Sequence, residues 1–228
     1  MEGKYSIAHI SALLAEPARV AMLVTLLDGT SRPASELAAA AKVSLPGASM
    51  HLAKLSEGRL LQMTRFGRHR YYRLAGPEVA AAVEALGTLS SFVRPTKLAP
   101  DAGMPPMRIA RTCYDHLAGE LAVSVCEALQ SRGCLDTSTF TLTQAGEVFL
   151  SDLGIDFGPL KANRKRPLVR KCLDWTERRF HIAGSLGAAL LGLFRQRSWL
   201  KRQPGSRLVT ITNEGKRAFR DIFEVQIR

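Results

Sequence analysis

The stretch from residue 34 to residue 74 constrains the fold of this chain more than any other. Residues 34–41 are mostly alanine with one leucine, a composition that favours a helix. Ser44 follows a short break and is a residue type that caps the start of the next helix, over residues 45–55. The apolar residues of this second helix keep helical spacing and should face the core: Ala48, Leu52 and Leu55.

The rest of this stretch has the pattern of a β-hairpin. Residues 60–63 lead to a turn at residues 66–68, and residues 71–74 return with aromatic side chains that favour strands. Basic side chains crowd the tip and the return strand: Arg65, Arg68, His69, Arg70 and Arg73. Two helices at a sharp turn, followed by a basic hairpin, predict a winged helix-turn-helix. In that fold the second helix enters the major groove and the wing contacts phosphates or the minor groove.

The outer face of the second helix and the wing therefore hold the candidate DNA-binding residues. A winged helix could instead serve protein contacts, with the arginines merely solvated. We favour DNA, because the basic residues gather where a wing meets the DNA backbone and the helix presents no large apolar docking face. The candidates are Ser44, Leu45, Pro46, Gly47, Ser49, Met50, His51, Lys54, Arg65, Arg68, His69, Arg70 and Tyr72.

Four short motifs lie within residues 6–93: Leu14-Ala-Glu-Pro-Ala-Arg19, Ser35-Glu-Leu-Ala38, Ser49-Met-His-Leu52 and Gly67-Arg-His-Arg-Tyr-Tyr-Arg-Leu74. Together they resemble the ArsR-type family of bacterial repressors. The resemblance implies a dimeric, cytoplasmic repressor that leaves its operator when an effector binds. Metal-binding members carry cysteines on the helix before the recognition helix, or His and Asp on the helix after the wing. Here residues 38–41 are alanines and residues 77–92 contain no histidine, so the resemblance implies no standard metal site.

The charge of the chain favours a polyanionic partner. The formal net charge is +12 and the isoelectric point about 10.1, and nucleic acid is the commonest partner of such a protein. Residues 1–98 carry a net charge of +5 and residues 99–228 a net charge of +7, so the excess of basic residues is not confined to the predicted winged helix-turn-helix. Nothing resembles a secretory signal, and the longest apolar run, near residues 182–194, is too short to span a bilayer. We therefore expect a cytoplasmic protein with no membrane partner and with reduced cysteines.

A proline-rich segment divides the chain. Residues 94–106 contain four prolines and a glycine, which cannot continue a helix. We place the boundary near Ala99, between a DNA-binding and dimerisation domain (residues 1–98) and a C-terminal domain that we expect to act as a sensor (residues 99–228). The helix expected just before it, over residues 78–92, carries an apolar stripe that can serve as core, as dimer seam or as both: Val79, Val83, Leu86, Leu89 and Phe92.

The second half contains what looks like an internal repeat. Three blocks recur in order, at offsets of 59, 65 and 69 residues: residues 113–115 with 172–174, 116–119 with 181–184, and 142–146 with 211–215. Each copy predicts a long helix, a short strand and a capped helix, which is winged-helix-like. The elements are helices over 116–131 and 181–197, strands over 140–142 and 208–211, and helices over 144–153 and 213–223. Chance similarity between short Ala/Gly-rich segments is the alternative. Between the copies, the basic run 161–171 is either solvated surface or an additional phosphate contact.

Two cysteines and two histidines occupy matching places in these copies. Cys113 and His116 lie three residues apart, which puts them on one face if the helix begins that early. Cys172 and His181 mark the second copy, and pseudo-symmetric packing would gather all four into a set that suits a zinc-like divalent metal. Two alternatives stay open. The four residues only pack, or the cysteines are thiol sensors activated by the neighbouring cations Arg111, Arg170 and Lys171. Cys126 and Cys134 are expected in the core.

The sequence thus predicts a mainly α protein with short β-hairpins, in which a winged helix-turn-helix precedes a duplicated winged-helix-like C-terminal domain. No hydrolase elbow, P-loop or dinucleotide fingerprint occurs, so we expect no enzyme. The predicted function is a homodimeric repressor that binds a double-stranded operator and is released by a metal, thiol-oxidising or small-molecule effector. The alternative is an architectural or partner-binding protein that coats DNA with little sequence specificity. Specificity over random DNA separates the two.

Overall fold

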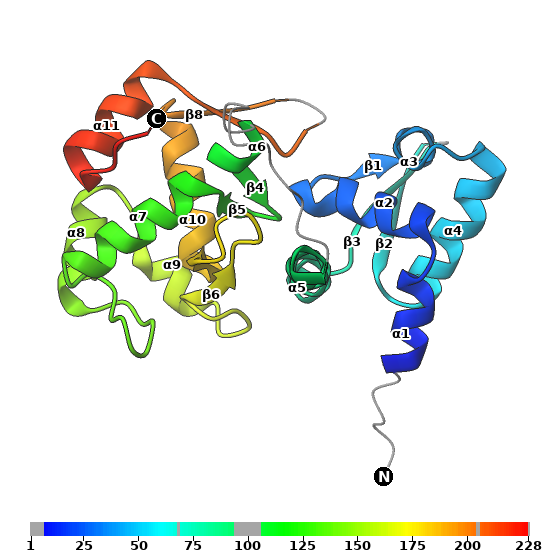
Figure 1. The fold of residues 1–228 in the computed structure, drawn as a ribbon, viewed down its shortest axis with the longest axis horizontal. Coiled ribbons are helices and arrows are strands. Elements are labelled where there is room, and N and C mark those ends of the chain that lie inside the picture. The colour runs from blue at the N-terminus through cyan, green and yellow to red at the C-terminus, as the bar shows by residue number, and fades with distance from the viewer. Residues whose placement is uncertain (1–6, 68, 94–105, 204–205, 228) are drawn as a thin grey trace, which may run out of the picture. The chain divides into compact units, whose positions relative to one another are not determined.

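The computed structural model describes residues 7–67, 69–93, 106–203 and 206–227 (Figure 1). Its contacts divide the chain into two compact units, Met1–Val83 and Glu84–Arg228. The boundary predicted near Ala99 falls outside the described residues. Each unit is described by itself.

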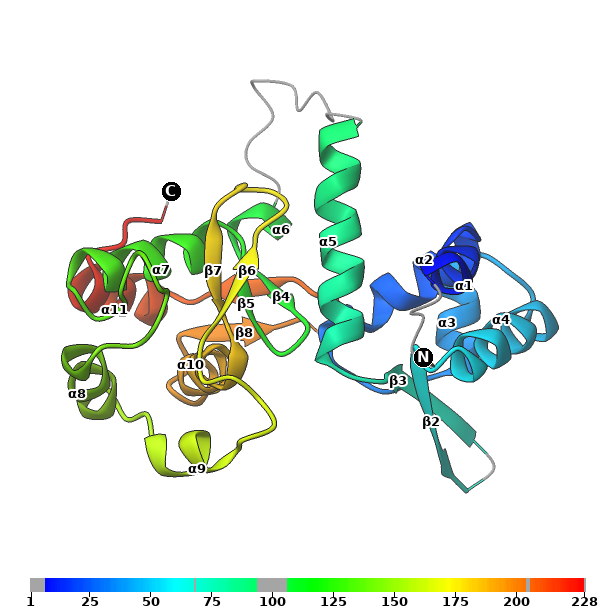
Figure 2. The same cartoon turned by 90° about the horizontal axis from the view of Figure 1, so that it is seen from below.

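The first unit contains helices, a 3₁₀ turn and a small sheet. Its elements are α1 (Ile7–Leu14), α2 (Pro17–Thr25), η1 (Leu26–Asp28), β1 (Arg32–Pro33), α3 (Ala34–Ala41), α4 (Leu45–Glu57), β2 (Leu61–Phe66) and β3 (His69–Leu74). The strands form an antiparallel sheet in the order β1-β3-β2. The predicted helix-turn-helix and wing are confirmed, and Figure 2 shows the β2–β3 hairpin extending away from α2, α3 and α4.

The core of this unit forms where α2, α3 and α4 pack pairwise on one another. The three α4 residues that were expected to face inward are fully buried, and so is Leu37 of α3. Burying a leucine side chain stabilises a fold by about 1.5–3 kcal/mol, so this packing fixes α4 against α3. The opposite face of α4 is left to solvent.

Helix α5 (Pro77–Val93) follows the wing. Its apolar stripe is divided between core and surface, because Val83 is buried whereas Leu86 and Leu89 are 45% and 57% exposed. The side chain of Phe92 lies outside the described residues. Within the described part of the chain, these two leucines, one turn apart, form an apolar strip without cover.

The second unit contains two series of elements, each with an antiparallel hairpin, a long helix after it and a later helix capped by threonine. The first series is α6 (Pro106–Ile109), β4 (Arg111–Cys113), β5 (His116–Ala118), α7 (Glu120–Ser131), α8 (Gln144–Asp152) and α9 (Phe157–Ala162). The second is β6 (Arg170–Leu173), β7 (Phe180–Ala183), α10 (Gly184–Gln196), β8 (Leu200–Arg202), β9 (Val209–Ile211) and α11 (Asn213–Phe223). Each of the strand pairs β4–β5, β6–β7 and β8–β9 is antiparallel.

The sequence-based prediction was wrong at the start of both long helices. Residues 116–118 and 180–183 are strands, and α7 and α10 begin only after them. Gly119 and Gly184 stand at these transitions with φ of +91° and +86°, a backbone region that glycine adopts far more readily than other residues. The preceding residues pair with a neighbouring strand instead of entering the helix.

The second half of each series agrees better with the prediction. Thr143 and Thr212 cap α8 and α11, and each hydroxyl oxygen accepts a hydrogen bond from a backbone N–H three residues on, at 3.0 and 2.9 Å. The strand expected at residues 208–211 is β9, whereas residues 140–142 contribute only the isolated bridge Leu135–Leu142.

Each long helix of the second unit packs on the hairpin of the other series. Helix α7 packs on β7, and α10 packs on β5, so the helix of each series covers the hairpin of the other. Aromatic rings close the core beside α10, in a group formed by Phe194, Trp199, Phe219 and Phe223. This reciprocal packing brings the two hairpins together.

Within the described ranges, no single helix is long and apolar enough to cross a membrane. The pair Ile7–Leu14 and Pro17–Asp28 would pass by length and composition together, but it is bent by 89°.

Candidate nucleic-acid interface and candidate metal centre

Helix α4 presents its first turns to solvent. Ser44 caps it, and the Ser44 hydroxyl oxygen accepts a hydrogen bond from the Gly47 N–H at 3.3 Å. Leu45 and Met50 are 53% and 65% exposed, and Ser49 is exposed beside them. Apolar side chains at these positions can contact a thymine methyl group in the major groove.

The other α4 candidates differ in exposure. Pro46 and Lys54 are exposed, whereas Gly47 and His51 are partly buried. The Nδ1 atom of His51 is buried and has no hydrogen-bond partner among the described residues. The exposed candidates lie on one side of α4, opposite the buried core residues.

The wing carries an unusual juxtaposition of charge. Arg65 on β2 lies directly opposite Arg70 on β3, and both are exposed. Like charges at opposed positions destabilise a strand pair, and neither arginine forms an ion pair within the described part of the chain. Phe66, at the tip, is 78% exposed. A polyanion lying along the hairpin would offset the repulsion between the two arginines and so lower the free energy of the hairpin.

The remaining wing candidates are placed as follows. His69 is exposed near the tip, and Arg68 lies outside the described residues. Tyr72 is only 7% exposed, because β1 and β2 flank it in the sheet, so its side chain is part of the core rather than of the DNA-facing surface. Arg73, which was not among the candidates, donates two hydrogen bonds to Gln62 across the hairpin.

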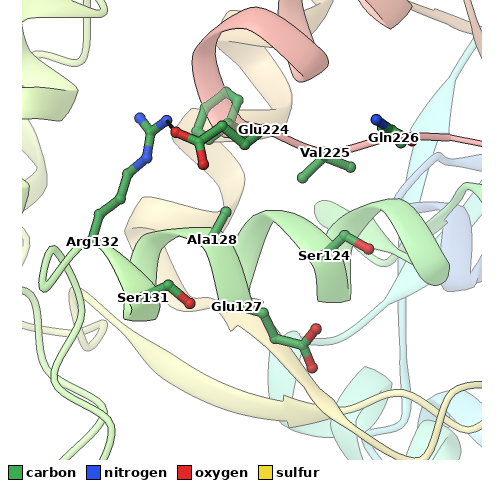
Figure 3. A pocket seen from close by; sticks show the side chains of 9 residues that line it. Ser124, Glu127, Ala128, Ser131, Arg132, Glu224, Val225 and Gln226 are labelled. Carbon is green, nitrogen blue, oxygen red and sulfur yellow. Dashed lines mark hydrogen bonds and ion pairs between the residues drawn. The ribbon is translucent and has the colours of Figure 1, made fainter.

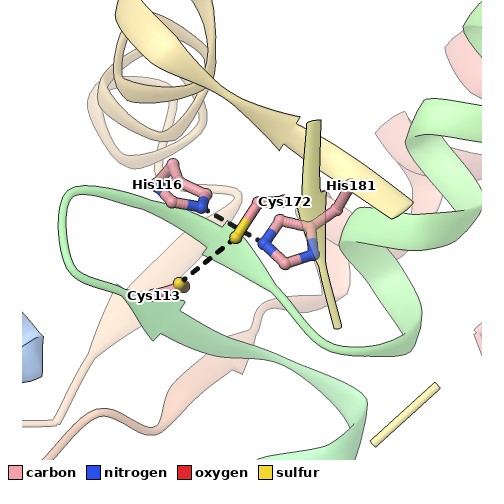
Figure 4. Close-up of side chains that lie close together, drawn as sticks. All are labelled: Cys113, His116, Cys172 and His181. Carbon is pink, nitrogen blue, oxygen red and sulfur yellow. Dashed lines mark hydrogen bonds between the residues drawn. The ribbon is translucent and has the colours of Figure 1, made fainter. Parts of the chain in front are cut away.

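In the second unit, the four predicted Cys and His residues meet (Figure 4). Their donor atoms all lie within 4.8 Å of one another. The Sγ atoms of Cys113 and Cys172 are 3.8 Å apart, and the Nε2 atoms of His116 and His181 are 3.2 Å apart. Cys172 is partly buried and the other three residues are buried.

The strand register explains how the cluster forms. Cys113 lies opposite His116 in the β4–β5 hairpin, and Cys172 lies opposite His181 in β6–β7. The prediction that Cys113 and His116 share one face of a helix was therefore wrong. They lie on two strands that a tight turn joins. The offsets of 59 and 65 residues imply a six-residue insertion in the second copy, Trp175 to Phe180. Its first five residues lie in the loop between β6 and β7 and Phe180 begins β7, so the insertion lengthens the hairpin without separating its Cys–His pair.

Carboxylates stand behind both imidazoles. The Nδ1 atom of His116 is hydrogen-bonded to Asp115 at 3.4 Å. The Nδ1 atom of His181 lies 3.5 Å from Asp174, but this contact is not aligned as a hydrogen bond. Each carboxylate is itself held by arginine. Arg166 contacts both oxygens of Asp115, at 2.6 and 3.0 Å.

Asp174 is the more enclosed of the two carboxylates. The fully buried Arg111 donates to both of its oxygens at 3.0 Å, and the Gly119 N–H donates at 2.7 Å. Burial raises the pKa of Asp174, but the charge of Arg111 and the hydrogen bonds from Thr176 and Gly119 outweigh it, so the carboxyl stays ionised with a pKa far below its usual range.

The two thiols of the cluster are not equivalent. The hydrogen bond with Cys172 and burial raise the pKa of Cys113 well above its usual value. The same hydrogen bond, with help from His116 and His181, lowers the pKa of Cys172 although burial opposes this. Cys172 is therefore the residue that carries thiolate character, and Cys113 is the one that donates.

Two of the three cations expected to activate these thiols, Arg111 and Lys171, have other partners. Arg111 is paired with Asp174, and the Lys171 ammonium lies over the rings of Phe140 and Phe180, at 5.3 and 5.5 Å. Cys126 and Cys134 are buried in the hydrophobic core, as expected, and all four cysteines are free thiols.

A surface cavity of about 410 Å³ lies between α7 and the C-terminal segment (Figure 3). Ser124, Glu127 and Arg132 line it on α7, and Glu224 and Gln226 line it on the segment that follows α11. An ion pair of 2.7 Å between Arg132 and Glu224 spans one end. Its lining is polar and its charges are already matched, so it holds no cluster comparable to the Cys–His group.

Comparison with known proteins gives a full-length relative. The chain is 41% identical over 224 residues to the uncharacterized HTH-type transcriptional regulator YdfF of Bacillus subtilis, and the match covers 97% of this chain and 99% of the relative. The chain belongs to the helix-turn-helix transcriptional regulators. The structure neighbours of its N-terminal part include a regulator described as possibly of the ArsR family, in agreement with the resemblance of its motifs. The predicted role as a DNA-binding transcription regulator is confirmed. No protein-family model matches the regulator.

Similar solved structures cover only the N-terminal part of the regulator. A Mycobacterium bovis fragment described as a possible transcriptional regulatory protein is 30% identical, with 37% of this chain and 90% of that chain covered and a TM-score of 0.35. The repressor BigR of Xylella fastidiosa is 28% identical, with 36% and 84% covered and a TM-score of 0.34. Reduced HlyU from Vibrio cholerae is 28% identical, with 36% and 85% covered and a TM-score of 0.33.

Sequence reasoning missed the residues that hold the regulator's histidines in place. Asp115 and Asp174 each stand two residues after a cluster cysteine, a regularity of the repeat that would have identified them. Arg166 belongs to the basic run that was read as solvated surface or phosphate contact. It instead contacts Asp115 and also donates to the Gly184 carbonyl oxygen at 2.8 Å, a long-range contact with no signal in the sequence.

Proposed function

We propose that this regulator is a homodimeric repressor that reads an inverted repeat with α4 and grips the flanking phosphates with its wing. The single observation that carries the DNA-reading part is the exposed first half of α4, with Leu45, Ser49 and Met50 on a helix whose other face is fixed in the core. A rigid helix with free outer side chains is the geometry that reads base edges in the major groove.

The homodimer is supported by α5. Leu86 and Leu89 expose an apolar strip that the single chain leaves uncovered, and a second copy would bury it symmetrically. Two recognition helices related by a two-fold axis read two half-sites about one helical turn apart, which is why the proposed operator is an inverted repeat.

The second unit is proposed to be a duplicated, winged-helix-like effector domain. Three features support duplication: the repeated sequence blocks, the repeated element order, and the reciprocal packing of α7 and α10 on each other's hairpins. The Cys–His cluster at the meeting point of the hairpins is the proposed place of effector action, by a metal ion or a thiol oxidant. Binding there would alter the packing of the hairpins and so the affinity of the dimer for its operator.

The rival function is a DNA-coating protein with little sequence specificity. The net charge of +7 on residues 99–228 favours it, because that charge lies outside the reader and would add affinity for any DNA. The wing arginines serve either function equally well.

Binding-site selection followed by affinity measurement tests the proposal. Purified full-length protein is expected to enrich an inverted repeat and to bind it roughly 10³–10⁷ times more tightly than random DNA at physiological salt. A ratio near one would support the coating protein instead. Reporter expression from the best site, with and without the regulator, then distinguishes repression from activation.

A further inference from the structure

We propose that Cys113, His116, Cys172 and His181 form a closed tetrahedral site for a zinc-class divalent ion, which ties the two hairpins of the second unit together. The inference deepens the effector part of the proposed function. It rests on the geometry of the cluster, and it is tested on the protein without DNA.

The distances within the cluster match those of a zinc site. Zinc lies about 2.3 Å from a cysteine sulfur and about 2.0–2.1 Å from a histidine nitrogen. At tetrahedral angles these lengths place the two sulfurs about 3.8 Å apart and the two nitrogens about 3.3 Å apart. The Sγ–Sγ distance is 3.8 Å and the Nε2–Nε2 distance is 3.2 Å. These two distances fit an ion directly, and all four donor atoms lie within 4.8 Å of one another.

The hydrogen-bond chemistry of the imidazoles points the same way. The Nδ1–H of His116 donates a hydrogen bond to Asp115, which favours the tautomer with the proton on Nδ1, and the Nδ1 atom of His181 lies 3.5 Å from Asp174 without a hydrogen bond. The two Nε2 atoms approach to 3.2 Å in a buried place, so the His116 lone pair is aimed at the position from which an ion would contact both imidazoles. A carboxylate behind a ligating histidine is the common outer arrangement of zinc sites, where it sets the tautomer and the ring orientation.

The donor set also defines which ions fit. Two sulfurs and two imidazole nitrogens suit borderline and soft ions such as Zn²⁺ and Cd²⁺, and they do not suit Mg²⁺ or Ca²⁺, which take oxygen ligands. Four protein ligands leave no open coordination position, so the site holds its ion without offering it to a substrate. As the ion binds, Cys113 releases its thiol proton to solvent and Cys172 binds as the thiolate. Two sulfurs and two imidazole nitrogens replace water molecules on the ion, so no oxidant or reductant is needed.

The site has a structural consequence because its ligands come from far apart in the chain. Cys113 and His116 belong to β4–β5, and Cys172 and His181 belong to β6–β7. One ion therefore links segments 59 residues apart at the point where the two series meet. An ion that binds the folded unit and not the unfolded chain raises the stability of that unit by mass action.

The test uses the full-length protein, reduced and stripped of metal with a chelator, and titrated with Zn²⁺ and Co²⁺. The expected result is one ion per chain, a visible tetrahedral Co²⁺ spectrum with a thiolate-to-metal band, displacement of Co²⁺ by Zn²⁺, and no binding of Mg²⁺. Zinc should also raise the unfolding midpoint of the stripped protein.

Two variants control for loss of fold. Cys172→Ala should weaken Zn²⁺ binding by at least about 100-fold and roughly halve the thiolate-to-metal band. Cys134→Ala, which removes a buried cysteine outside the cluster, should keep both. Circular dichroism of both variants verifies that the helices are retained, and the Co²⁺ band of Cys172→Ala reports the ligand change without depending on stability.

Three results would overturn the proposal. They are the absence of a thiolate-to-Co²⁺ band in the wild type, equal loss of metal in Cys134→Ala and Cys172→Ala, and a Cys113–Cys172 disulfide formed by mild oxidant at the same rate with and without excess Zn²⁺. The last result would make the pair a thiol switch. Because none of these measurements uses DNA, a failure here is distinct from a failure of operator binding.

Discussion

Asp28 is a buried carboxylate at the end of η1, in the loop that leads to β1. Burial raises its pKa, but hydrogen bonds from the Thr30 N–H and hydroxyl and from Arg32 outweigh this and lower it below the model-compound value. Because the folded-state pKa is lowered, the stability that Asp28 contributes is present above its unfolded pKa of about 3.9. It is lost as the pH falls through the folded-state pKa.

We therefore expect Asp28→Asn to destabilise the protein at pH 7 by about 1–3 kcal/mol, because the buried hydrogen bonds to Arg32 and Thr30 lose their charge. The difference from wild type should begin to shrink as the pH falls below about 4, where the unfolded-state carboxyl takes up its proton, and should vanish once the pH lies below the lowered folded-state pKa. Urea unfolding at several pH values measures this. A difference that stayed constant down to pH 2 would show that the charge of Asp28 contributes nothing.

Met50 is the other residue with a distinct prediction. It offers only apolar contact, whereas an arginine at that position can donate two hydrogen bonds to guanine, worth about 1–3 kcal/mol of discrimination. Met50→Arg should therefore change the preferred operator sequence, as measured by binding-site selection. Met63→Arg adds the same charge on exposed β2 and should raise affinity without changing the preference. Equal selected sequences for wild type and Met50→Arg would argue against α4 as the reader.

At the scale of the element, the wing is a hairpin with two arginines directly opposite each other. Their repulsion destabilises the free hairpin, and binding to a phosphate backbone would offset it. Replacing Arg65 and Arg70 with alanine should weaken binding to operator and random DNA by similar factors. Each phosphate contact contributes a slope of about 0.9 in log K against log salt, so the double variant should lower the slope by about 2. Affinity measured from low to moderate salt gives both numbers.

A matched control for the wing is the pair Arg217→Ala and Arg220→Ala on α11, which removes the same charge from exposed positions of the second unit. This variant should leave the salt slope nearly unchanged if the wing makes the phosphate contacts. Equal effects of the two double variants would instead fit a protein that coats DNA through its general charge.

At the scale of the whole molecule, the exposed leucines of α5 connect one chain to a second. Each leucine buried in a dimer contributes about 1.5–3 kcal/mol, so Leu86→Ser with Leu89→Ser should turn a dimer into a monomer at micromolar concentration. Light scattering measures the mass, and operator binding should fall because one chain holds only one half-site. Val148→Ser removes an exposed apolar side chain from α8 and should change neither. A wild type that is monomeric, with full operator affinity, would contradict the dimer.

The winged unit could be predicted almost element by element because its determinants are local. Apolar spacing set the buried face of α4, Ser44 marked its start, and the run of basic and aromatic residues marked the wing. Tyr72 is the exception. Its place on the return strand fitted the wing surface, but its side chain is buried, and which face of β3 packs on the core is decided by tertiary packing rather than by the local pattern.

In the second unit, the sequence by itself determined which residues form the cluster, because the repeat paired Cys113 with Cys172 and His116 with His181. It did not determine how they meet. Whether residues 116–118 and 180–183 are strand or helix is settled by pairing with a neighbouring strand, and local propensity carries little of that information. The carboxylates and arginines behind the histidines were likewise fixed only in three dimensions. Arg166 and Asp115 are 51 residues apart, and no local pattern encodes a contact that arises when two separately formed hairpins pack together.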